Sequence, residues 1–363
     1  MNTDQNKEKW LKVASLFDTD TPVKSVKTFG NGLINTTLLV TTESGRRYIL
    51  QKINTAIFLK PEELQQNLRR ITDHMRRCNR ETGKPDADRH VLTMVKTRDG
   101  KEYAEVDGEA WRMTLYVEGS HTEDKLTPEK ARLTGKAFAE FHSFFARPDA
   151  PQLADTIPGF HDIALRLRQL REAIANDPVG RLAEVQDICD KLLARSEEML
   201  LANRLHAEGK LPRRIAHHDT KLNNILFDED GSILCVIDLD TVMPGFLLSD
   251  FGDFIRTGAN TGAEDDSDLS RVGVDMDIFR AFAEGYIPEA TFLTDEEKKT
   301  FPFGARMLTY MQTVRFLTDY INGDSYYKTL YPEHNLVRTR AQLRLLEELD
   351  RHAAEMDAII ASL

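Results

Sequence analysis

The residues of this chain best suited to chemistry lie in one short run, 215–227, and in the apolar run that follows it. Asp219 stands two residues after His217, and Asn224 stands five residues after Asp219. A further carboxylate, Asp238, ends the next apolar run. One carboxylate can deprotonate an attacking hydroxyl, while an amide oxygen and a second carboxylate can hold a Mg²⁺ ion on nucleotide phosphates. The spacing therefore predicts phosphoryl transfer.

The predicted roles divide this set into one base and two metal ligands. Asp219 is the predicted catalytic base, and Asn224 and Asp238 are the predicted Mg²⁺ ligands. A surface turn could also contain this spacing, but the apolar residues on both sides and the returning strand favour the functional interpretation. We expect His217 to support the loop through hydrogen bonds. Lys221 could neutralise the transferred phosphoryl group or could be an ordinary solvated lysine.

Asp240 adds a second acidic group two residues after Asp238. An extended backbone would place both carboxylates on one side, where they repel each other unless a cation or hydrogen-bond donors hold them. Asp240 could orient the metal, bind a substrate hydroxyl, or cap the turn before Met243. The sequence leaves these interpretations open.

A glycine turn near the N-terminus could contribute to nucleotide binding. Gly30 and Gly32 lie between two predicted strands, where an ordinary hairpin turn would explain them. In a chain with a phosphoryl-transfer segment, the N–H groups of such a turn could also cradle phosphates. Asn35, Thr36 and Thr37 follow the turn and add side-chain donors.

The third predicted strand should supply a cation for the phosphates. Gln51 and Lys52 point to opposite faces of that strand, so only one of them can serve. Lys52 is the predicted phosphate ligand because it alone carries a charge. We expect its acidic partner to be Glu62 or Glu63, although the helix dipole also favours acidic residues in a first helical turn.

The elements that must position these residues change character along the chain. Strand patterns and one helical pattern fill the first third, and long helical patterns fill most of the rest. The predicted strands lie at 23–29, 35–42, 47–53, 91–96, 102–106 and 111–117, with a helix at 61–77. The predicted helices of the second part lie at 128–145, 160–175, 180–208 and from 275 onward, ending in a helix at 335–362; strand character returns between 215 and 238.

These patterns predict an α+β, bilobal, protein-kinase-like fold. Residues 1–117 would form a β-rich N-lobe, with a sheet of about five strands and one helix, that covers the nucleotide phosphates. Residues 118–363 would form a mostly helical C-lobe that carries the catalytic loop. A hinge near Tyr116 and Val117 would join the lobes and lie against the adenine.

Composition excludes several other classes of function. The chain has 363 residues, and its formal charge is 48 − 59 = −11, which argues against a nucleic-acid partner. Its three cysteines form no C-x-x-C pair, so neither a zinc ribbon nor a dithiol redox site is indicated. The polar N-terminus and the lack of a run of about 18 apolar residues predict a soluble, cytoplasmic protein without a membrane partner. We expect it to be a monomer.

Together, these motifs resemble those of the aminoglycoside phosphotransferase/choline kinase-like superfamily. The resemblance covers nearly the whole chain, and its later runs are most similar to kinases that act on N-acetylhexosamines. The runs are Gly30-x-Gly-x-Ile-Asn-Thr-Thr37, Tyr48-Ile-Leu-Gln51, His217-x-Asp-Thr-Lys-Leu-Asn-Asn-Ile-Leu226, Ile237-Asp-Leu-Asp-Thr-x-Met-Pro-Gly245, Asp250-Phe-Gly-Asp253, Arg315-Phe-Leu-x-Asp-Tyr320 and Tyr331-Pro-Glu-His-Asn-Leu-Val-Arg338.

The resemblance implies a donor, an acceptor and a sugar site. The donor would be ATP with Mg²⁺, and the acceptor would be the anomeric 1-hydroxyl of N-acetylglucosamine or N-acetylgalactosamine. Asp240, Arg315 and Tyr326 would contact the sugar. An internal ion pair between Arg315 and Asp319, or another acid, is an equally good explanation of an arginine within an apolar helix.

Two rival functions stay open on the sequence. One is a kinase of another small alcohol or amine, such as an aminoglycoside, choline or homoserine. Sites for cationic substrates collect several carboxylates, so the charge of the substrate site would separate these possibilities. The other rival is a catalytically weak nucleotide-binding module.

Overall fold

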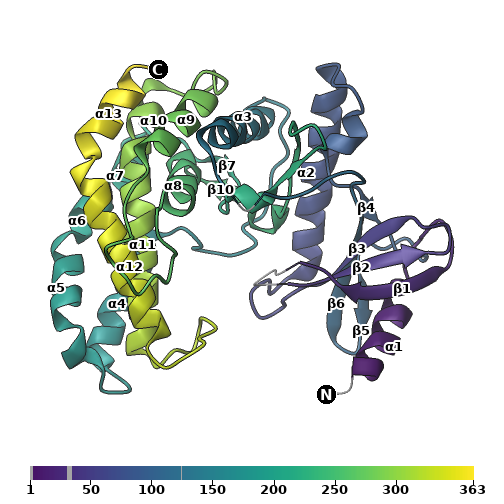
Figure 1. Cartoon of the computed structure of the whole chain (residues 1–363), viewed down its shortest axis with the longest axis horizontal. Coiled ribbons are helices and arrows are strands. Elements are labelled where there is room, and N and C mark those ends of the chain that lie inside the picture. Colours follow the sequence, from purple (N-terminus) through teal and green to yellow (C-terminus); the bar gives the residue numbers. More distant parts are fainter. Residues whose placement is uncertain (1–2, 31–34, 124) are drawn as a thin grey trace. The chain divides into compact units, whose positions relative to one another are not determined.

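The computed structural model describes residues 3–30, 35–123 and 125–363. The described chain forms two compact units. Unit 1 takes in the chain up to Thr122 together with Pro148–Pro158 and Ile225–Thr241, and unit 2 takes in Glu123–Arg147, Gly159–Asn224 and Val242–Leu363. The predicted α+β class is confirmed, with a β-sheet in unit 1 and mostly helices in unit 2 (Figure 1). Gly32, a predicted phosphate-binding residue, lies outside the described residues.

The main element of unit 1 is an antiparallel sheet of six strands, one more than the five expected. Its strand order is β1-β2-β3-β6-β4, and β5 pairs with β6. In the register of the sheet, Gln51 lies opposite Thr37 on one side and Arg112 on the other. The strands are β1 (Val23–Thr28), β2 (Thr36–Thr42), β3 (Arg47–Lys52), β4 (Met94–Val95), β5 (Ala104–Val106) and β6 (Glu109–Leu115).

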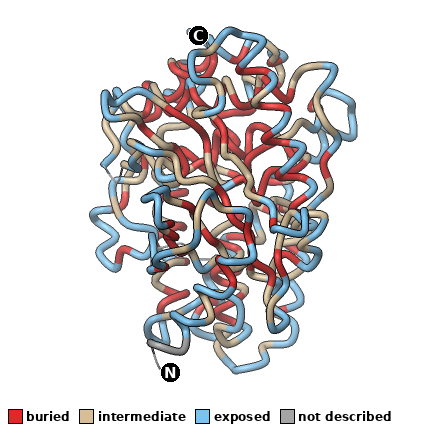
Figure 2. Tube along the Cα trace, turned by 90° about the vertical axis from the view of Figure 1, so that its right-hand side faces the viewer, coloured by how far each residue is buried: buried red, intermediate tan, exposed pale blue. Residues whose placement is uncertain are grey.

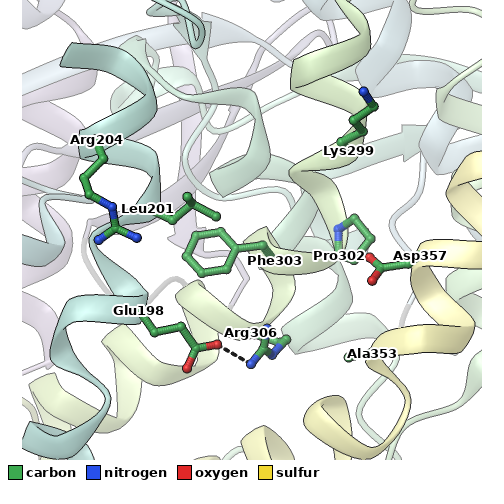
Figure 3. A pocket seen from close by; sticks show the side chains of 9 residues that line it. All are labelled: Glu198, Leu201, Arg204, Lys299, Pro302, Phe303, Arg306, Ala353 and Asp357. Carbon is green, nitrogen blue, oxygen red and sulfur yellow. Dashed lines mark hydrogen bonds and ion pairs between the residues drawn. The ribbon is translucent and has the colours of Figure 1, made fainter. Parts of the chain in front are cut away.

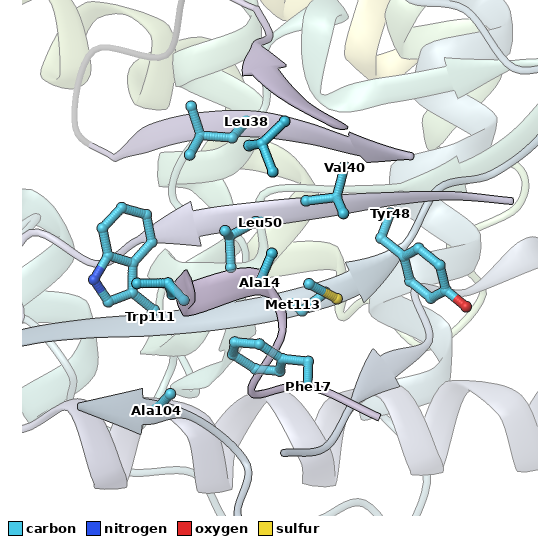
Figure 4. Close-up of a cluster of buried hydrophobic side chains, with 11 residues drawn as sticks. Ala14, Phe17, Leu38, Val40, Tyr48, Leu50, Ala104, Trp111 and Met113 are labelled. Atoms are coloured by element: carbon cyan, nitrogen blue, oxygen red, sulfur yellow. The ribbon is translucent and has the colours of Figure 1, made fainter. Parts of the chain in front are cut away.

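One face of this sheet forms an apolar core with the N-terminal helix α1 (Thr3–Ala14). The sequence patterns did not predict this helix. Alternate residues of the strands point into this core, as the period of a strand requires. Trp111 is 1% exposed, and burial of such large side chains is the main stabilising contribution. The cluster, drawn in Figure 4, consists of Val13, Ala14, Phe17, Val26, Leu38, Val40, Tyr48, Leu50, Ala104, Trp111 and Met113.

The remaining elements of unit 1 include the segment that carries the predicted metal-binding Asp. Helix α2 (Pro61–Glu81) begins with Pro61, a residue suited to the first helical turn, and a short 3₁₀ helix, η1 (Ala87–His90), follows it. Strands β8 (Ile225–Phe227) and β9 (Ile233–Val236) form the predicted hairpin. The 3₁₀ helix η4 (Leu239–Thr241) follows β9 and packs against α2.

Unit 2 is built from helices that pack in pairs. Helix α3 packs against α9, and α11 packs against α8 and α12. Some pairs approach closely through glycine: a Cβ on Gly252 in α8 would lie 2.2 Å from the carbonyl oxygen of Gly304 in α11. The helices are α3 (Pro128–Phe145), α4 (Ile163–Asn176), α5 (Gln186–Ala194), α6 (Ser196–Met199), α7 (Leu201–Ala207), α8 (Leu247–Gly258), α9 (Met276–Tyr286), α10 (Asp295–Lys299), α11 (Phe301–Ile321), α12 (His334–Arg351) and α13 (Ala353–Ala361), with the 3₁₀ helices η2 (Leu182–Glu184) and η3 (Leu222–Asn224).

Three parts of unit 2 differ from the sequence prediction. The stretch 180–208 is broken into η2, α5, α6 and α7, and the last helix is interrupted at His352. Helix α8 was not predicted, because acidic residues and a glycine interrupt its apolar pattern.

In Figure 2, the buried positions follow the inner faces of the elements, and the exposed positions follow loops and outer faces. Across the described residues, no helix is both long and apolar enough to span a membrane.

Candidate active site

A pair of short strands in unit 2 presents the predicted catalytic loop. Strand β7 (Arg214–Ala216) pairs with β10 (Met243–Gly245), and the loop 217–221 follows β7 directly. His218 adopts a left-handed backbone conformation with φ of 65°, which is uncommon for a residue with a side chain. A Cβ on Gly245 would lie 2.3 Å from Nε2 of His218. The glycine is therefore required for the loop to pass so close to β10.

Asp250 in α8 anchors the start of this loop. Its carboxylate accepts hydrogen bonds from the backbone N–H groups of His217 (2.5 Å) and His218 (2.8 Å). Nε2 of His142 lies 2.7 Å from the same carboxylate, and Nδ1 of His142 lies 2.7 Å from the hydroxyl of Tyr286. Burial opposes the charge on Asp250, but the bond with His142 and the charges of His142, His218 and His217 together outweigh burial and lower the pKa of Asp250. Asp250 is therefore an ionised acceptor that fixes two consecutive peptides.

Asp253, one helical turn further along α8, anchors the next residue of the loop. Its carboxylate accepts the N–H of Thr220 at 3.2 Å and pairs with Arg256 at 2.9 Å. Burial raises the pKa of Asp253, and the nearby charge of Asp219 raises it further, whereas Arg256 lowers it. The run Asp250-Phe-Gly-Asp253, which had no predicted role, therefore holds the predicted catalytic loop in place.

Asp219 itself is a partly exposed carboxylate with a cation beside it. Nζ of Lys221 lies 2.7 Å from its Oδ1, and the side chain of Asp219 is 22% exposed. Burial opposes the charge on Asp219, but the charge and hydrogen bond of Lys221, with smaller contributions from His217 and Asn224, together lower the pKa of Asp219 below its usual value. Lys221 is thus paired with Asp219, and its role in neutralising the transferred phosphoryl group stays a prediction. Asp219 is thus ionised and accessible at neutral pH, as a base must be.

The amide of Asn224 is oriented by the same loop. Its Nδ2 donates a hydrogen bond to the backbone carbonyl of Asp219 at 2.8 Å. Because the nitrogen is used in this way, the side-chain oxygen of Asn224 is left as an acceptor suited to a hard cation. The residue is in η3 and immediately precedes β8, whose first residue pairs with Val236 of β9.

Asp238 follows the end of β9 by two residues and has a left-handed backbone with φ of 58°. This conformation turns the chain sharply, so the expectation of an extended segment from Asp238 to Asp240 was wrong. No group of three or more His, Cys, Asp or Glu side chains that could hold a metal occurs among the described residues. A Mg²⁺ ion held by one amide oxygen and one carboxylate, with phosphates and water completing its shell, requires no such group.

Asp240 is in η4, where it is 2% exposed and fully engaged. Both of its carboxylate oxygens form a two-point ion pair with Arg112 of β6. Nδ2 of Asn35 donates to Oδ2 of Asp240 at 2.8 Å, and Oδ1 of Asn35 accepts the N–H of Asn54. The donors that hold Asp240 thus come from β6 and from the residue that precedes β2.

The two candidates on β3 lie on opposite faces of the sheet, as alternation requires. Gln51 donates to the hydroxyl of Thr37 at 3.2 Å and accepts two hydrogen bonds from Arg112. Lys52 lies on the same face as Trp111 and pairs with Glu109 at 3.3 Å. The expectation that Glu62 or Glu63 would pair with Lys52 was therefore wrong, and Glu63 instead pairs with Lys60. The role of Lys52 in phosphate binding stays a prediction.

The other predicted nucleotide-binding residues of unit 1 lie on and beside the sheet. Gly30 has a left-handed φ of 69°, and Thr36 begins β2. Tyr116 follows β6 with Arg47 stacked 4.2 Å above its ring, and the carbonyl of Val117 accepts the hydroxyl of Ser120 at 2.6 Å. Their proposed contacts with the nucleotide stay predictions.

Arg315 and Tyr326 come together in unit 2. The guanidinium carbon of Arg315 lies 5.5 to 5.9 Å from the ring centroids of Phe160, Tyr326 and Tyr327. We call these four residues the arginine–aromatic cluster. At such distances the cation is attracted to the negative faces of the rings. Tyr326 is 60% exposed, so a ligand can reach the cluster.

The alternative of an internal ion pair for Arg315 is not what the structure contains. Asp319 accepts the N–H groups of Tyr326 (2.8 Å) and Tyr327 (2.9 Å) and an amide hydrogen of Asn335. Within the described ranges, Arg315 has no ion pair with a carboxylate, and its hydrogen bond goes to the amide of Gln312. Asp319 thus shapes the tyrosine loop and forms no ion pair with Arg315 among the described residues.

Further basic groups lie beside the arginine–aromatic cluster. Arg166 donates to the carbonyls of Gly159 and Phe160, and burial, together with the charge of Arg315, lowers the pKa of Arg166. Burial also lowers the pKa of His161 well below its usual value, with a further contribution from His218 and then Arg315. Among the described residues, Nε of Arg166 and Nδ1 of His161 are buried without a hydrogen-bond partner. This region therefore contains a guanidinium N–H and an imidazole nitrogen that have no hydrogen-bond partner among the described residues.

A cavity of about 230 Å³ lies elsewhere in unit 2 (Figure 3). Its lining mixes cations with acids, and Arg306 is already paired with Glu198 there. It contains none of the predicted site residues. The lining residues are Glu198, Leu201, Arg204, Lys299, Pro302, Phe303, Arg306, Ala353 and Asp357.

Comparison with solved structures supports the fold. An aminoglycoside phosphotransferase from Alicyclobacillus acidocaldarius is similar, with a TM-score of 0.63, 15% identity, and 97% of this chain and 96% of that chain covered. The choline kinase LicA from Streptococcus pneumoniae has a TM-score of 0.56 and 15% identity over 96% of this chain and 100% of its own. The amicoumacin kinase hAmiN, in complex with AMP-PNP, Ca²⁺ and Ami, has a TM-score of 0.57 and 16% identity over 97% of this chain and 96% of its own.

The family of the chain follows from its sequence match. Residues 25–286 match the model of the phosphotransferase enzyme family (APH). The matched segment includes the sheet of unit 1 except the first two residues of β1, the predicted catalytic loop, and helix α8 with its two anchoring carboxylates. The chain belongs to the phosphotransferase enzyme family, and it is a kinase-like phosphotransferase.

Proposed function

We propose that this protein is an ATP- and Mg²⁺-dependent kinase that phosphorylates the anomeric 1-hydroxyl of an N-acetylhexosamine, N-acetylglucosamine or N-acetylgalactosamine. Its products would be the sugar 1-phosphate and ADP. The observation that carries the choice of acceptor is the arginine–aromatic cluster, whose cation has no carboxylate partner among the described residues.

Asp219 would act on the acceptor hydroxyl. Its carboxylate, kept ionised by Lys221, would accept a hydrogen bond from the 1-hydroxyl and take its proton as the new bond to phosphorus forms. The anchoring of the loop by Asp250 and Asp253 supports this role, because a base must be held within hydrogen-bond reach of its substrate.

Asn224 and Asp238 would hold the Mg²⁺ ion. An amide oxygen and a carboxylate are ligands that Mg²⁺ accepts, and the fixed orientation of the Asn224 amide fits this use. Bound there, the ion would neutralise charge on the ATP phosphates. Gly30, Gly32, Asn35, Thr36, Thr37 and Lys52 are the proposed phosphate-side contacts, and Tyr116 and Val117 are the proposed adenine-side contacts.

Arg315 and Tyr326 would bind the sugar. A guanidinium and a phenol can donate hydrogen bonds to hydroxyl and carbonyl oxygens, and an aromatic ring can pack against the apolar face of a sugar. A quaternary ammonium or an aminoglycoside would instead meet an uncompensated positive charge. Asp240 is a proposed sugar contact as well; to serve as one, it would have to accept a sugar hydroxyl in addition to Arg112 and Asn35.

The same cluster also favours a second acceptor class, an alcohol that carries a carboxylate, such as homoserine. A guanidinium without an acidic partner pairs well with a carboxylate. The panel of acceptors below includes homoserine for this reason.

The proposal is tested by measuring ADP release with MgATP across a panel of acceptors. The panel would contain N-acetylglucosamine, N-acetylgalactosamine, glucose, homoserine, choline and kanamycin, with the phosphate position read by NMR. We expect turnover on the two N-acetylhexosamines with phosphate on the anomeric carbon. Turnover on choline or kanamycin alone, or phosphate on another carbon, would contradict the proposal.

A matched pair of variants tests the acceptor site within the same assay. Arg315→Lys keeps the positive charge but loses the planar fork and its stacking, so we expect a raised KM for the sugar with little change in the KM for ATP. Arg195→Lys changes an arginine that is paired with Asp350, so it should leave both values unchanged. Equal KM values for the sugar in Arg315→Lys and the unaltered protein would show that Arg315 does not bind the sugar.

A further inference from the structure

We propose that Arg112 is a positioning residue for phosphoryl transfer. It fixes Asp240, and the short turn between Asp238 and Asp240 passes this constraint on to the orientation of Asp238. The inference rests on the proposed metal role of Asp238. Arg112 had no predicted role, because an arginine in the middle of a strand carries no motif of its own. Its importance becomes visible only through its partners in unit 1.

The contacts of Arg112 leave its side chain little freedom. Its Nε and Nη2 donate to Oε1 of Gln51 at 3.0 and 2.8 Å. Its Nη1 and Nη2 pair with the two carboxylate oxygens of Asp240, and the Nη2 bond is 2.9 Å long. The planar guanidinium therefore connects β3 with η4 in one fixed orientation.

Burial makes this connection strong and specific. The side chains of Arg112 and Asp240 are 5% and 3% exposed, so water cannot replace either partner. Asn35 supplies a further donor to Asp240, and the hydroxyl of Thr156 donates to the backbone carbonyl of Asp240 at 3.0 Å. The carboxylate and the peptide of Asp240 are thus both held.

The sheet supplies the rigid support for this arrangement. Thr37, Gln51 and Arg112 face one another across β2, β3 and β6, on the face opposite the apolar core. Figure 4 shows the core face, with Leu50 and Trp111 pointing into it. Because Gln51 and Arg112 lie on strands in the centre of the sheet, they can hold Asp240 in a fixed position.

Asp238 lies only two residues from Asp240, and the chain between them has few conformations available. Asp238 has a left-handed backbone, and Leu239–Thr241 forms a 3₁₀ turn. Fixing the side chain and peptide of Asp240 therefore fixes the direction in which the Asp238 carboxylate leaves the backbone. Groups that orient a metal ligand typically change metal affinity or activity 10- to 100-fold when they are replaced, so we expect about a tenfold effect here.

The test is the Mg²⁺ dependence of nucleotide binding and of ADP release in Arg112→Lys. A lysine keeps the charge but cannot bond Gln51 and both oxygens of Asp240 at once. We expect the Mg²⁺ concentration for half-maximal activity to rise about tenfold, with kcat at saturating Mg²⁺ largely recovered. Binding of ADP without Mg²⁺, measured by calorimetry, should remain close to that of the unaltered protein.

Two further variants separate positioning from a purely structural role. Arg195→Lys alters an arginine that also forms a two-point pair, with Asp350, so it should lower the unfolding temperature without moving the Mg²⁺ dependence. Gln51→Ala removes the neutral partner of Arg112 and keeps the ion pair, so it should shift the Mg²⁺ dependence in the same direction by a smaller factor. This second variant also covers the case in which Arg112→Lys does not fold.

The outcomes are distinct. An unchanged Mg²⁺ dependence in Arg112→Lys, or in Gln51→Ala if the former does not fold, would overturn the positioning role. If the unaltered protein bound nucleotide equally well with and without Mg²⁺ and released no ADP, the proposed metal role of Asp238 would fail first, and this inference with it.

Discussion

Replacing Asp250 with Asn tests whether α8 holds the catalytic loop in its working position. The Asp250 carboxylate has two acceptor oxygens for the N–H groups of His217 and His218 and for Nε2 of His142. An asparagine keeps one oxygen and presents an NH₂ group to a donor, so one buried donor loses its partner. Loss of a hydrogen bond to a charged group, together with an unpaired buried donor, predicts a decrease of about 2–4 kcal/mol in the free energy of unfolding.

The same substitution should impair catalysis more than nucleotide binding. The two peptides that share this acceptor immediately precede Asp219, and displacement of a catalytic group by about 1 Å can cost about 100-fold in rate. We expect Asp250→Asn to lower kcat by about 10- to 100-fold, with a small change in the affinity for ADP. Urea unfolding followed by circular dichroism gives the stability, and coupled ADP release gives kcat.

The pH dependence of the stability difference is set by the sign of the pKa shift. The pKa of Asp250 is lowered in the folded protein, so its carboxylate stabilises the fold fully above the ordinary carboxyl pKa. The difference in unfolding free energy between the two proteins should therefore be constant from about pH 5 to 8 and should shrink below about pH 4.

A matched control distinguishes anchoring of the loop from general destabilisation. Glu297 is another buried carboxylate, 2% exposed, and it accepts hydrogen bonds from the backbone N–H of Thr294 and from Nε of Arg214. Glu297→Gln should lower the stability by a comparable amount and leave kcat nearly unchanged at temperatures well below its unfolding. If Asp250→Asn lost stability but retained the kcat of the control, the anchoring role would be refuted.

Three further predictions follow from the site and its surroundings. Lys221→Met removes the cation that lowers the pKa of Asp219, so the acid limb of the pH dependence of kcat/KM should move to higher pH; an unmoved limb would mean that Asp219 does not control it. Gly245→Ala places a methyl group against His218 and should cost about 1–3 kcal/mol in thermal unfolding, whereas an unchanged melting temperature would contradict the close approach. Burial raises the pKa of Cys235 to about 12 and that of Cys189 to about 11, so mass spectrometry should find both thiols unlabelled by iodoacetamide at pH 8 in the native protein and labelled after unfolding.

The α+β class and most elements could be predicted from the sequence because their signals are local. The strands of the sheet show β-branched residues between glycine turns, and helix α3 begins at a Thr127 cap followed by Pro128, so its bounds were predicted correctly. Helix α8 was missed because Asp250 and Asp253, which anchor the catalytic loop, replace apolar residues on its buried side. Buried hydrogen-bonded carboxylates here interrupt the apolar period that predicts a helix.

Within the candidate site, the local spacing of residues could be predicted from the sequence, but their long-range partners could not. The spacing of Asp219 and Asn224 is local, and the hydrogen bond between them is present in the structure. The partners of Asp240 could not be predicted, because Arg112 and Asn35 lie 128 and 205 residues away in the chain. The alternative for Arg315 could be settled only by seeing that Asp319 is occupied by the backbone of Tyr326 and Tyr327. Long-range pairing of polar groups leaves no periodic signal in a sequence.

The measurement that tests the central claim most directly is the turnover of Asp219→Asn with MgATP and an N-acetylhexosamine. Asparagine keeps the size of the side chain and removes its ability to take a proton. Loss of a general base typically costs about 100- to 10,000-fold in rate, so we expect ADP release to fall by at least about 100-fold while calorimetry shows nucleotide binding largely retained. A variant that released ADP at nearly the normal rate would contradict the assignment of Asp219 as the base.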